Sequence, residues 1–208
     1  MKEALVVLGA GGHAKVVIEI LEERGEFEIA GCISREQGGE VLGLPILGGD
    51  EVLPSLYARG VRKAFVAIGE NRVRRAVMER AAAAGFELVN AVSRHAIVSP
   101  RARLGCGVTV MPGAIVNVMS RIGDGAIINT GATVDHDSEI GRWSHVAPGT
   151  NLAGGAIIGE GVFLGIGSRV LPCVTVGAWT TVGAGAVVIA DLPGGVTAIG
   201  VPAVVRDR

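Results

Sequence analysis

The chain has 208 residues, which is enough for one or two domains. Hydrophobic residues make up 49%, with only 3% aromatic residues and 33 glycines, a composition that suits a solenoid built from small aliphatic side chains. The net charge of −1, without a run of lysine or arginine, argues against a nucleic-acid partner.

The compartment is predicted from the N-terminal stretch and the cysteines. The first apolar run is too short to span a membrane and lacks the cleavage pattern of a signal peptide, so no membrane partner is expected. Cys32, Cys106 and Cys173 have neither metal-ligand nor disulfide spacing. These features favour the reducing cytoplasm.

Residues 1–92 alternate between strand and helix patterns. Strands are expected at 5–8, 29–33, 64–68 and 87–92, and helices at 14–24, 50–59 and 71–84. Asp50 and Asn71 are the expected N-caps of the second and third helices. Alternating strands and helices predict a small Rossmann-like α/β domain with a parallel sheet.

A glycine-rich turn, Gly9-Ala10-Gly11-Gly12-His13-Ala14, follows the first strand. Such turns place backbone N–H groups and a helix N-terminus against a phosphate, although a tight strand-to-helix turn also uses glycine. The second strand ends at Ser34-Arg35 without an acid for a ribose hydroxyl, so NAD is not indicated. A nucleotide-diphosphate site is predicted instead, with Gly69 lining the same pocket.

From Val98 to Val188 every sixth residue is aliphatic. This period matches neither a helix nor an alternating strand and is typical of a parallel β-helix, here predicted for residues 93–208. Three hexads form one triangular coil, so residues 18 apart stack on each other. Glycines such as Gly123 and Gly141 follow the aliphatic position, where we expect corner dihedrals that other residues resist.

The candidate chemistry lies in four histidines: His13, His95, His136 and His145. His136 lies two residues after Val134, at a corner whose neighbours one coil away are Val118 and Gly154. A neutral imidazole there can act as a general base, and the adjacent Asp137 carboxylate can hold its tautomer. The alternative is a surface histidine beside solvated acids.

His145 follows His136 by half a coil, so the two side chains are expected on different sides of one prism. One site uses both only if a neighbouring subunit supplies the second, which predicts an oligomer with interfacial sites. His145 is otherwise structural, as we expect for His95. His13 lies at a helix start, where it either contacts a bound ligand or has only a structural role.

Three strings in the prism and the glycine turn resemble one family over nearly the whole chain: 129–137 (NTGATVDHD), 145–149 (HVAPG), 200–203 (GVPA) and 9–13 (GAGGH). The family is the bacterial sugar acetyltransferases of the hexapeptide-repeat superfamily, typified by sialic acid O-acetyltransferases and the UDP-4-amino-sugar N-acetyltransferase of bacillosamine synthesis. The resemblance implies a left-handed coil, against the general right-handed preference of parallel crossovers. It further implies a homotrimer, a nucleotide-sugar-binding N-terminal domain, and acetyl-CoA in the groove between subunits.

The resemblance also implies roles for individual residues. It makes His136 the general base and Asp137 the group that raises its basicity. The implied acetyl-CoA contacts are His145, Gly154, Ile166 and Ala184. The implied nucleotide-sugar contacts are Gly11, Gly12, His13 and Gly69, with Ser34 and Arg35 at the positions where the bacillosamine enzyme has paired aspartates.

The expected function is direct acetyl transfer from acetyl-CoA to the amino group of a nucleotide-linked 4-amino-deoxysugar. The alternatives are a sialic-acid-type sugar O-acetyltransferase and a non-catalytic nucleotide-sugar-binding protein. An acyl-enzyme through Cys106 or Cys173 is disfavoured because neither lies near His136 in the hexad count. A three-histidine zinc site is also disfavoured, since no two histidines are closer than nine residues in sequence, and no metal is expected.

Overall fold

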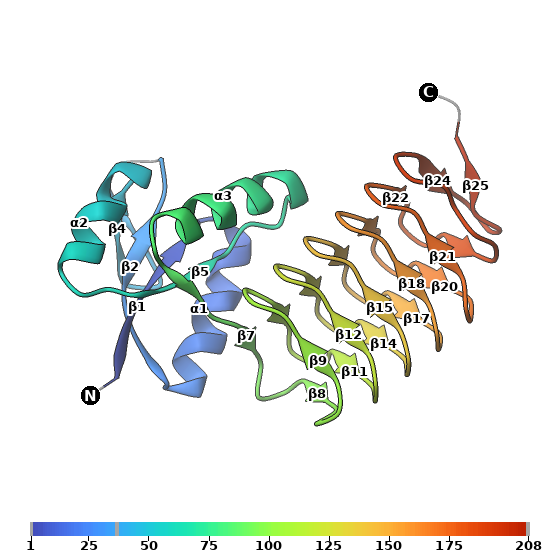
Figure 1. The fold of residues 1–208 in the computed structure, drawn as a ribbon, viewed down its shortest axis with the longest axis horizontal. Helices are drawn as coiled ribbons and strands as arrows, with labels where there is room; N and C mark the ends of the chain where they lie inside the picture. The colour runs from blue at the N-terminus through green and yellow to red at the C-terminus, as the bar shows by residue number, and fades with distance from the viewer. Residues whose placement is uncertain (1, 36–37, 207–208) are drawn as a thin grey trace. The chain divides into compact units, whose positions relative to one another are not determined.

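The computed structural model in Figure 1 describes residues 2–35 and 38–206. They form two compact units that divide between Arg94 and His95, whereas the sequence places the division between residues 92 and 93. Each unit is described by itself below. No helix in the described ranges is long and apolar enough to cross a membrane.

The first unit is an α/β domain around a mostly parallel sheet with the strand order β3-β4-β2-β1-β5-β6. Its strands are β1 Glu3–Leu8, β2 Phe27–Ile33, β3 Glu40–Val41, β4 Leu44–Gly48, β5 Lys63–Val66 and β6 Glu87–Leu88, and the short strand β7 Ala91–Val92 belongs to a different sheet. Its helices are α1 Gly12–Arg24, the 3-10 helix η1 Asp50–Val52, α2 Leu53–Ala58 and α3 Asn71–Ala83. The expected Rossmann-like unit is confirmed, and the β3–β4 hairpin, which the sequence pattern did not predict, adds a further parallel strand beside β2.

The two predicted N-caps are wrong. Glu70 caps α3, because its carboxylate accepts hydrogen bonds from the Arg72 and Val73 N–H groups at 3.0 and 2.6 Å. Asn71 is the first helical residue, and its Oδ1 accepts a hydrogen bond from Arg74 instead. Asp50 begins η1 after Gly49, and its carboxylate pairs with Arg80 on α3 rather than with its own helix.

The second unit is a triangular parallel β-helix whose strands line three faces (Figure 1). The first face, here the β14 face, holds β8 Ile97–Val98, β11 Ile115–Val116, β14 Thr133–Val134, β17 Asn151–Leu152, β20 Arg169–Val170 and β23 Val187–Val188. The β15 face holds β9 Arg103–Leu104, β12 Arg121–Ile122, β15 Glu139–Ile140, β18 Ile157–Ile158 and β21 Thr175–Val176. The β16 face holds β10 Thr109–Val110, β13 Ile127–Ile128, β16 His145–Val146, β19 Phe163–Leu164, β22 Thr181–Val182 and β24 Thr197–Ile199, closed by the antiparallel β25 Val204–Val205.

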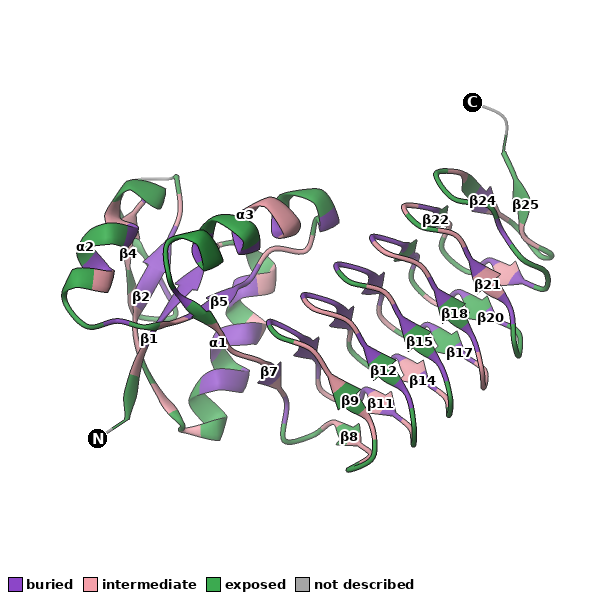
Figure 2. Ribbon diagram, in the orientation of Figure 1, coloured by how far each residue is buried: buried purple, intermediate pink, exposed green. Residues whose placement is uncertain are grey.

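Stacked aliphatic side chains fill the core of the prism. Val134 pairs in register with Val116 on one side and with Leu152 on the other, each 18 residues away. All three are buried, whereas the residue before each of them points outward, so purple and non-purple positions alternate along the coils in Figure 2. The hexad prediction is therefore confirmed at the level of single residues.

Small residues two positions before the core aliphatics lie inside the corners. Ser138 and Ser144 are fully buried, and the Ser144 hydroxyl donates to the Gly159 carbonyl of the next coil at 2.7 Å. A hydroxyl in this place satisfies a backbone acceptor that the tight corner leaves without a ladder partner. The corner thus tolerates a small polar side chain, not only alanine.

The repeated glycines serve a different purpose from the one expected. Gly123 and Gly141 do not have positive φ. A Cβ built on Gly141 would lie 2.5 Å from the Glu160 nitrogen of the next coil, and one on Gly123 would lie 2.6 Å from the Arg142 nitrogen. These positions need glycine because two backbones approach closely, and the positive φ angles occur two residues later.

Truncation of a core position should destabilise the prism much more than truncation of its outward neighbour. Leu152→Ala removes a side chain that is 2% exposed, and we expect it to lower the free energy of unfolding by about 2–5 kcal/mol. Asn151→Ala, on the exposed side of the same strand, should cost less than about 1 kcal/mol. Chemical denaturation of both variants measures the difference, and equal losses would contradict the assigned register.

Candidate active site

His136 lies on the prism edge where the chain passes from β14 to β15. Asp137 forms the tight corner with a φ of 57°, a left-handed conformation that aspartate adopts more readily than most residues. The corner turns both side chains outward, and they are 56% and 65% exposed. The edge therefore presents an imidazole and a carboxylate together to solvent.

The imidazole of His136 is oriented by its neighbour in sequence. Its Nδ1 lies 2.8 Å from Asp137 Oδ2. Because an ionised carboxylate only accepts hydrogen bonds, Nδ1 carries the proton and the lone pair lies on Nε2, beside Gly154. The hydrogen bond that Nδ1 donates to Asp137, with the negative charge of Asp135, raises the pKa of His136 above its ordinary value.

Asp135 belongs to the same charge cluster, although the sequence reasoning did not single it out. Its Oδ1 accepts hydrogen bonds from the His136 N–H at 2.8 Å and from Asn117 Nδ2 at 2.9 Å. These bonds lower the pKa of Asp135, so it stays ionised and supports the charged form of the imidazole. The sequence does contain a sign of this contact, since Asn117 and Asp135 are 18 residues apart and residues at that interval stack on each other.

Gly154 lies against the imidazole, one coil beyond His136. A Cβ built on Gly154 would be 2.6 Å from His136 Cε1 and 2.7 Å from Nε2, so any side chain there would displace the ring. Within the described residues the Gly154 N–H donates to no acceptor, whereas its carbonyl accepts from the Cys173 N–H at 3.0 Å. A free backbone N–H beside an imidazole is suited to bind a ligand oxygen with negative charge.

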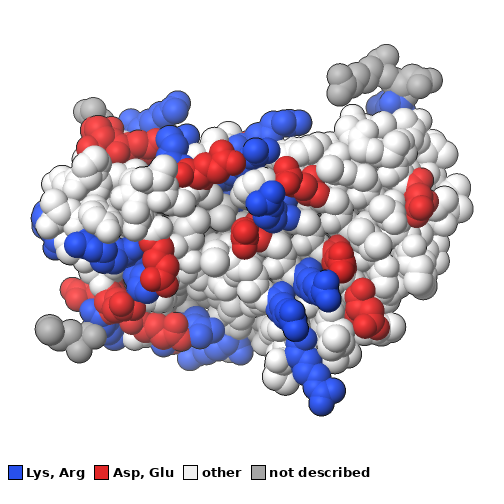
Figure 3. Space-filling model, viewed as in Figure 1, with Lys and Arg blue, Asp and Glu red and all other residues white. Residues whose placement is uncertain are grey.

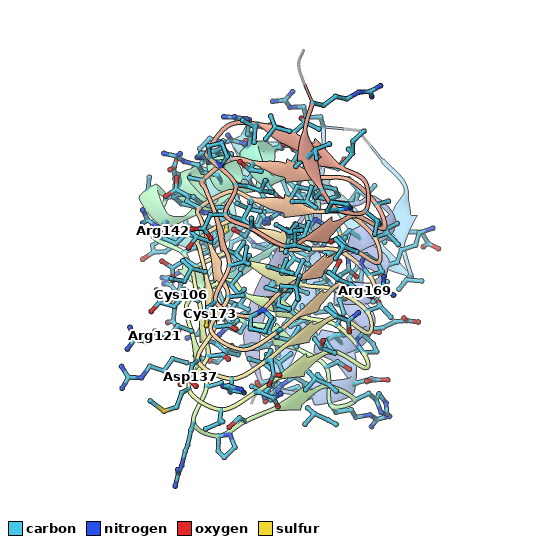
Figure 4. The ribbon with its side chains drawn as sticks, turned by 90° about the vertical axis from the view of Figure 1, so that its right-hand side faces the viewer. Cys106, Arg121, Asp137, Arg142, Arg169 and Cys173 are labelled. Atoms are coloured by element: carbon cyan, nitrogen blue, oxygen red, sulfur yellow. The ribbon has the colours of Figure 1, made fainter. Side chains whose placement is uncertain are left out.

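Cys173 is closer to this edge than the hexad count suggested. Asp137, Gly155 and Cys173 occupy equivalent corner positions in successive coils, and the Cys173 sulfur would lie 3.1 Å from a Cβ on Gly155. Figure 4 shows Asp137, Cys173 and Cys106 on one side of the prism and Arg169 on the other. Cys173 therefore shares the His136 edge, two coils beyond Asp137, and contacts Gly154 and Gly155 rather than the imidazole, while Cys106 lies at a different corner, beside Asp124.

The other implied acetyl-CoA contacts do not adjoin His136 within one chain. His145 projects from the β16 face, where Asn129 Nδ2 approaches its Nε2 at 3.0 Å and its ring packs edge-on against Phe163. Ile166 and Ala184 stack on each other at the edge between the β16 and β14 faces, and Ile166 is 62% exposed. Of the predicted catalytic and acetyl-CoA residues, the chain itself brings together His136, Asp137 and Gly154.

The described residues contain no group of three or more His, Cys, Asp or Glu side chains that could hold a metal ion. Charged side chains of both signs intermix on the face shown in Figure 3. That face therefore carries no extended field of one sign.

A second candidate site lies in the α/β unit at the carboxyl ends of its strands. A pocket of about 420 Å³ is lined by Leu8, Gly9, Ile33, Ser34, Arg35, Asp50, Ile68, Val73, Val77 and Arg80. Two of the predicted substrate contacts, Ser34 and Arg35, belong to this lining. In sheets of this kind ligands bind at the carboxyl edge.

The glycine turn beside this edge leaves a helix N-terminus open. Gly9 has a φ of 127°, and a Cβ there would lie 2.6 Å from the Ala67 carbonyl oxygen, so only glycine fits. Gly11 caps α1 without a side chain, and there is open space beside Gly11 and Gly12. Among the described residues no acceptor takes the N–H groups of Gly12 and His13, which suits a phosphate.

His13 lies at the same helix start, and its buried Nε2 has no hydrogen-bond partner among the described residues. Burial and the positive charge of Arg74 lower the pKa of His13 to about 4. The ring is therefore neutral near pH 7.

Arg74 was missed by the sequence reasoning, since an arginine in a helical pattern usually faces solvent. It is only 1% exposed and donates to the carbonyls of Ile68 and Gly69 at 3.1 and 2.8 Å and to Asn71 Oδ1 at 2.9 Å. Burial lowers its pKa to about 10, so it stays charged at neutral pH. Arg74 thereby holds the loop that carries Gly69.

Comparison with known proteins places both units. The family description "PglD N-terminal domain" matches residues 4–81, and "bacterial transferase hexapeptide (six repeats)" matches residues 155–190. Comparison with curated protein sequences gave no match.

Solved structures match over the whole chain. A histidine-to-asparagine mutant of perosamine N-acetyltransferase from Caulobacter crescentus, in complex with CoA and GDP-perosamine, is 51% identical, with a TM-score of 0.97 over 99% of this chain and 97% of that one. The acetyltransferase domain of PglB from Neisseria gonorrhoeae, in complex with acetyl coenzyme A, is 41% identical, with a TM-score of 0.94 over 99% and 100%. WeeI from Acinetobacter baumannii, at 24% identity, shares the fold with a TM-score of 0.88 over 99% and 100%.

The fold and its repeats define a hexapeptide-repeat acyltransferase with an N-terminal α/β domain, whose coil is left-handed as expected. The chain belongs to the family of sugar N-acetyltransferases that includes perosamine N-acetyltransferase and the PglB acetyltransferase domain. The resemblance noted in the sequence is confirmed, and so is acetyl-CoA as the co-substrate of this family.

The charge cluster around His136 predicts how its titration responds to substitution. Asp137→Asn removes the charged partner of Nδ1, so the pKa of His136 should fall, and Asp135→Asn should lower it by less. NMR titration of the imidazole in the three proteins measures these midpoints. An unchanged midpoint in Asp137→Asn would show that the hydrogen bond does not form in solution.

Proposed function

We propose that this chain transfers the acetyl group of acetyl-CoA to the amino group of a nucleotide-linked 4-amino-deoxysugar. The observation that carries this proposal is the exposed His136–Asp137 pair with a free Nε2, in a chain that is 51% identical to perosamine N-acetyltransferase. The complex of that relative with CoA and GDP-perosamine supports a GDP-linked amino sugar as the acceptor.

In the proposed mechanism His136 acts as the general base. The sugar amine attacks the thioester carbonyl, the C–N bond forms, and Nε2 takes the proton that the amine loses. The Nδ1 hydrogen bond to Asp137 stabilises the resulting imidazolium. When the C–S bond breaks, the imidazolium returns the proton to the departing thiolate, so CoA leaves as a thiol.

Gly154 is proposed to stabilise the tetrahedral intermediate. Gly154 adjoins the imidazole, and its N–H donates to no acceptor in the part of the chain that the structure describes. A preorganised donor at the developing oxyanion is among the larger contributions to acyl transfer.

We further propose that one unit binds the substrate and the other catalyses acetyl transfer. The unit up to Arg94 binds the nucleotide sugar, with phosphates at the α1 N-terminus near Gly11, Gly12 and His13 and the base toward Ser34 and Arg35. The unit from His95 onward performs the transfer. The free thiols of Cys32, Cys106 and Cys173 support a reducing, cytoplasmic location.

The positions of the implied acetyl-CoA contacts support a homotrimer with sites between subunits. His145, Ile166 and Ala184 lie on a different face and edge from His136. They share a groove with His136 only when a neighbouring prism supplies them. We therefore propose that each site combines the His136 edge of one subunit with the Ile166 edge of the next.

Removal of the base should lower turnover strongly. His136→Ala should reduce kcat for acetylation of a GDP-linked 4-amino sugar by about 10²–10⁴-fold with little change in KM. The lost imidazole takes the proton during the chemical step and contributes little to binding the substrate. His95→Ala, which removes an exposed imidazole elsewhere in the chain, serves as the control. Release of the CoA thiol measures the rate, and full turnover by His136→Ala would exclude this residue as the base.

Mixed oligomers test whether sites lie between subunits. Co-expression of His136→Ala chains with Ala184→Trp chains should restore part of the activity that each lacks alone, since some interfaces then combine two intact halves. Co-expression of His136→Ala with Gly154→Ala should restore none. Both positions lie on the same edge of a subunit, so the His136 edge is altered in every chain of such a mixed oligomer. Light scattering should give the mass of a trimer, and a monomeric, active enzyme would overturn the arrangement.

A further inference from the structure

The pocket at the carboxyl edge of the α/β unit has apolar walls and a charged rim. Its walls come from the aliphatic side chains of Leu8, Ile33, Ile68, Val73 and Val77. Val73 and Val77 lie one turn apart on α3, so one face of this helix lines the pocket. Flat, aliphatic walls suit a heterocyclic base, and the volume of about 420 Å³ lies within the range of small-molecule sites.

Asp50 and Arg80 form an ion pair on the rim. Arg80 Nε and Nη2 lie 2.9 and 2.8 Å from the same carboxylate oxygen, Oδ2. Arg80 Nη1 also donates to the Ala76 carbonyl of its own helix at 3.3 Å, which restricts the guanidinium. Asp50 Oδ1 accepts no hydrogen bond within the described residues, and the side chain is 45% exposed.

The backbone around Asp50 is held in place from two sides. The Ser34 N–H, at the end of β2, donates to the Gly48 carbonyl at 2.9 Å. The Gly49 N–H donates to Glu51 Oε1 at 2.8 Å, and a Cβ on Gly49 would lie 2.5 Å from Glu51 Oε2. The carboxylate of Asp50 therefore has a defined position beside the base pocket before any ligand binds.

We propose that Asp50 determines which nucleobase binds. Its carboxylate accepts hydrogen bonds from the N1–H and the 2-amino group of guanine, so the site selects a guanosine diphosphate sugar. Guanine presents two adjacent donors on one edge, which match the two lone pairs that Asp50 Oδ1 keeps while Oδ2 binds Arg80. Uracil presents one N–H between two carbonyl oxygens, which a carboxylate repels. Arg80 is the positioning residue that orients Oδ1 toward the base. This inference rests on the proposed function, since it assigns the nucleotide of the same substrate.

Binding of free nucleotides to the intact protein tests the proposal without catalysis. Calorimetry with GDP, IDP and UDP compares bases that differ in single donors, because hypoxanthine lacks only the 2-amino group. The wild-type protein should bind GDP about tenfold to a hundredfold more tightly than IDP, the range for one hydrogen bond to a charged group. UDP should bind more weakly than GDP.

Asp50→Asn should reduce the GDP-to-IDP ratio to less than about threefold, since the amide nitrogen then faces the 2-amino group. Glu51→Gln is the matched control: it removes the neighbouring charge, lies outside the pocket lining and keeps an oxygen for the Gly49 N–H, so it should retain the wild-type ratio. Arg80→Gln should lower the ratio partly. Asp50→Ser replaces the asparagine variant if thermal melting shows that the latter is unfolded.

The outcomes separate this inference from the proposed function. Equal binding of GDP and IDP by the wild-type protein, or an unchanged ratio in Asp50→Asn, would overturn the role of Asp50, even if acetylation of a nucleotide amino sugar were observed. Conversely, a GDP preference that depends on Asp50 supports the inference even if no amino sugar is acetylated, and only the proposed function would then fail.

Discussion

Coil-on-coil stacking at an interval of 18 residues is the constraint on which the transferase unit depends. Alternate backbone N–H groups along the strands donate to carbonyls of the next coil, as Thr133 does to Thr150 and Asp135 to Leu152. Residues 18 apart therefore lie side by side throughout the prism. The hydrogen bond from Asn117 to Asp135 and the contact of His136 with Gly154 both follow from this interval. Polar groups that are far apart in the sequence therefore lie together in one column along the prism.

Much of the prism and part of the candidate site could be predicted because the period of six is a strong pattern. The aliphatic ladder, the outward position of His136 and its neighbours Val118 and Gly154 all follow from counting. The same count, applied with more care, would have placed Cys173 on the His136 edge and would have found Asp135. Counting could not predict why position 141 needs glycine, because the close approach of two backbones there depends on how tightly successive coils pack.

The α/β unit was predictable in outline but not in its contacts. Its alternation of strands and helices gives the sheet, whereas the caps depend on which polar side chain has a competing partner. Asn71 and Asp50 look like caps in sequence, but Arg74 and Arg80 bind them in the folded unit. Burial of Arg74 is likewise a tertiary effect, since three acceptors converge on it only after the loop following β5 has folded.

The buried guanidinium of Arg74 has a consequence for substrate affinity. Because it ties the Ile68 and Gly69 carbonyls to α3 in the absence of ligand, this segment has little conformational entropy left to lose if the nucleotide binds where we propose. Preorganisation of this kind lets a modest set of contacts yield useful binding, and it leaves the rest of the interaction energy to discriminate among acceptors.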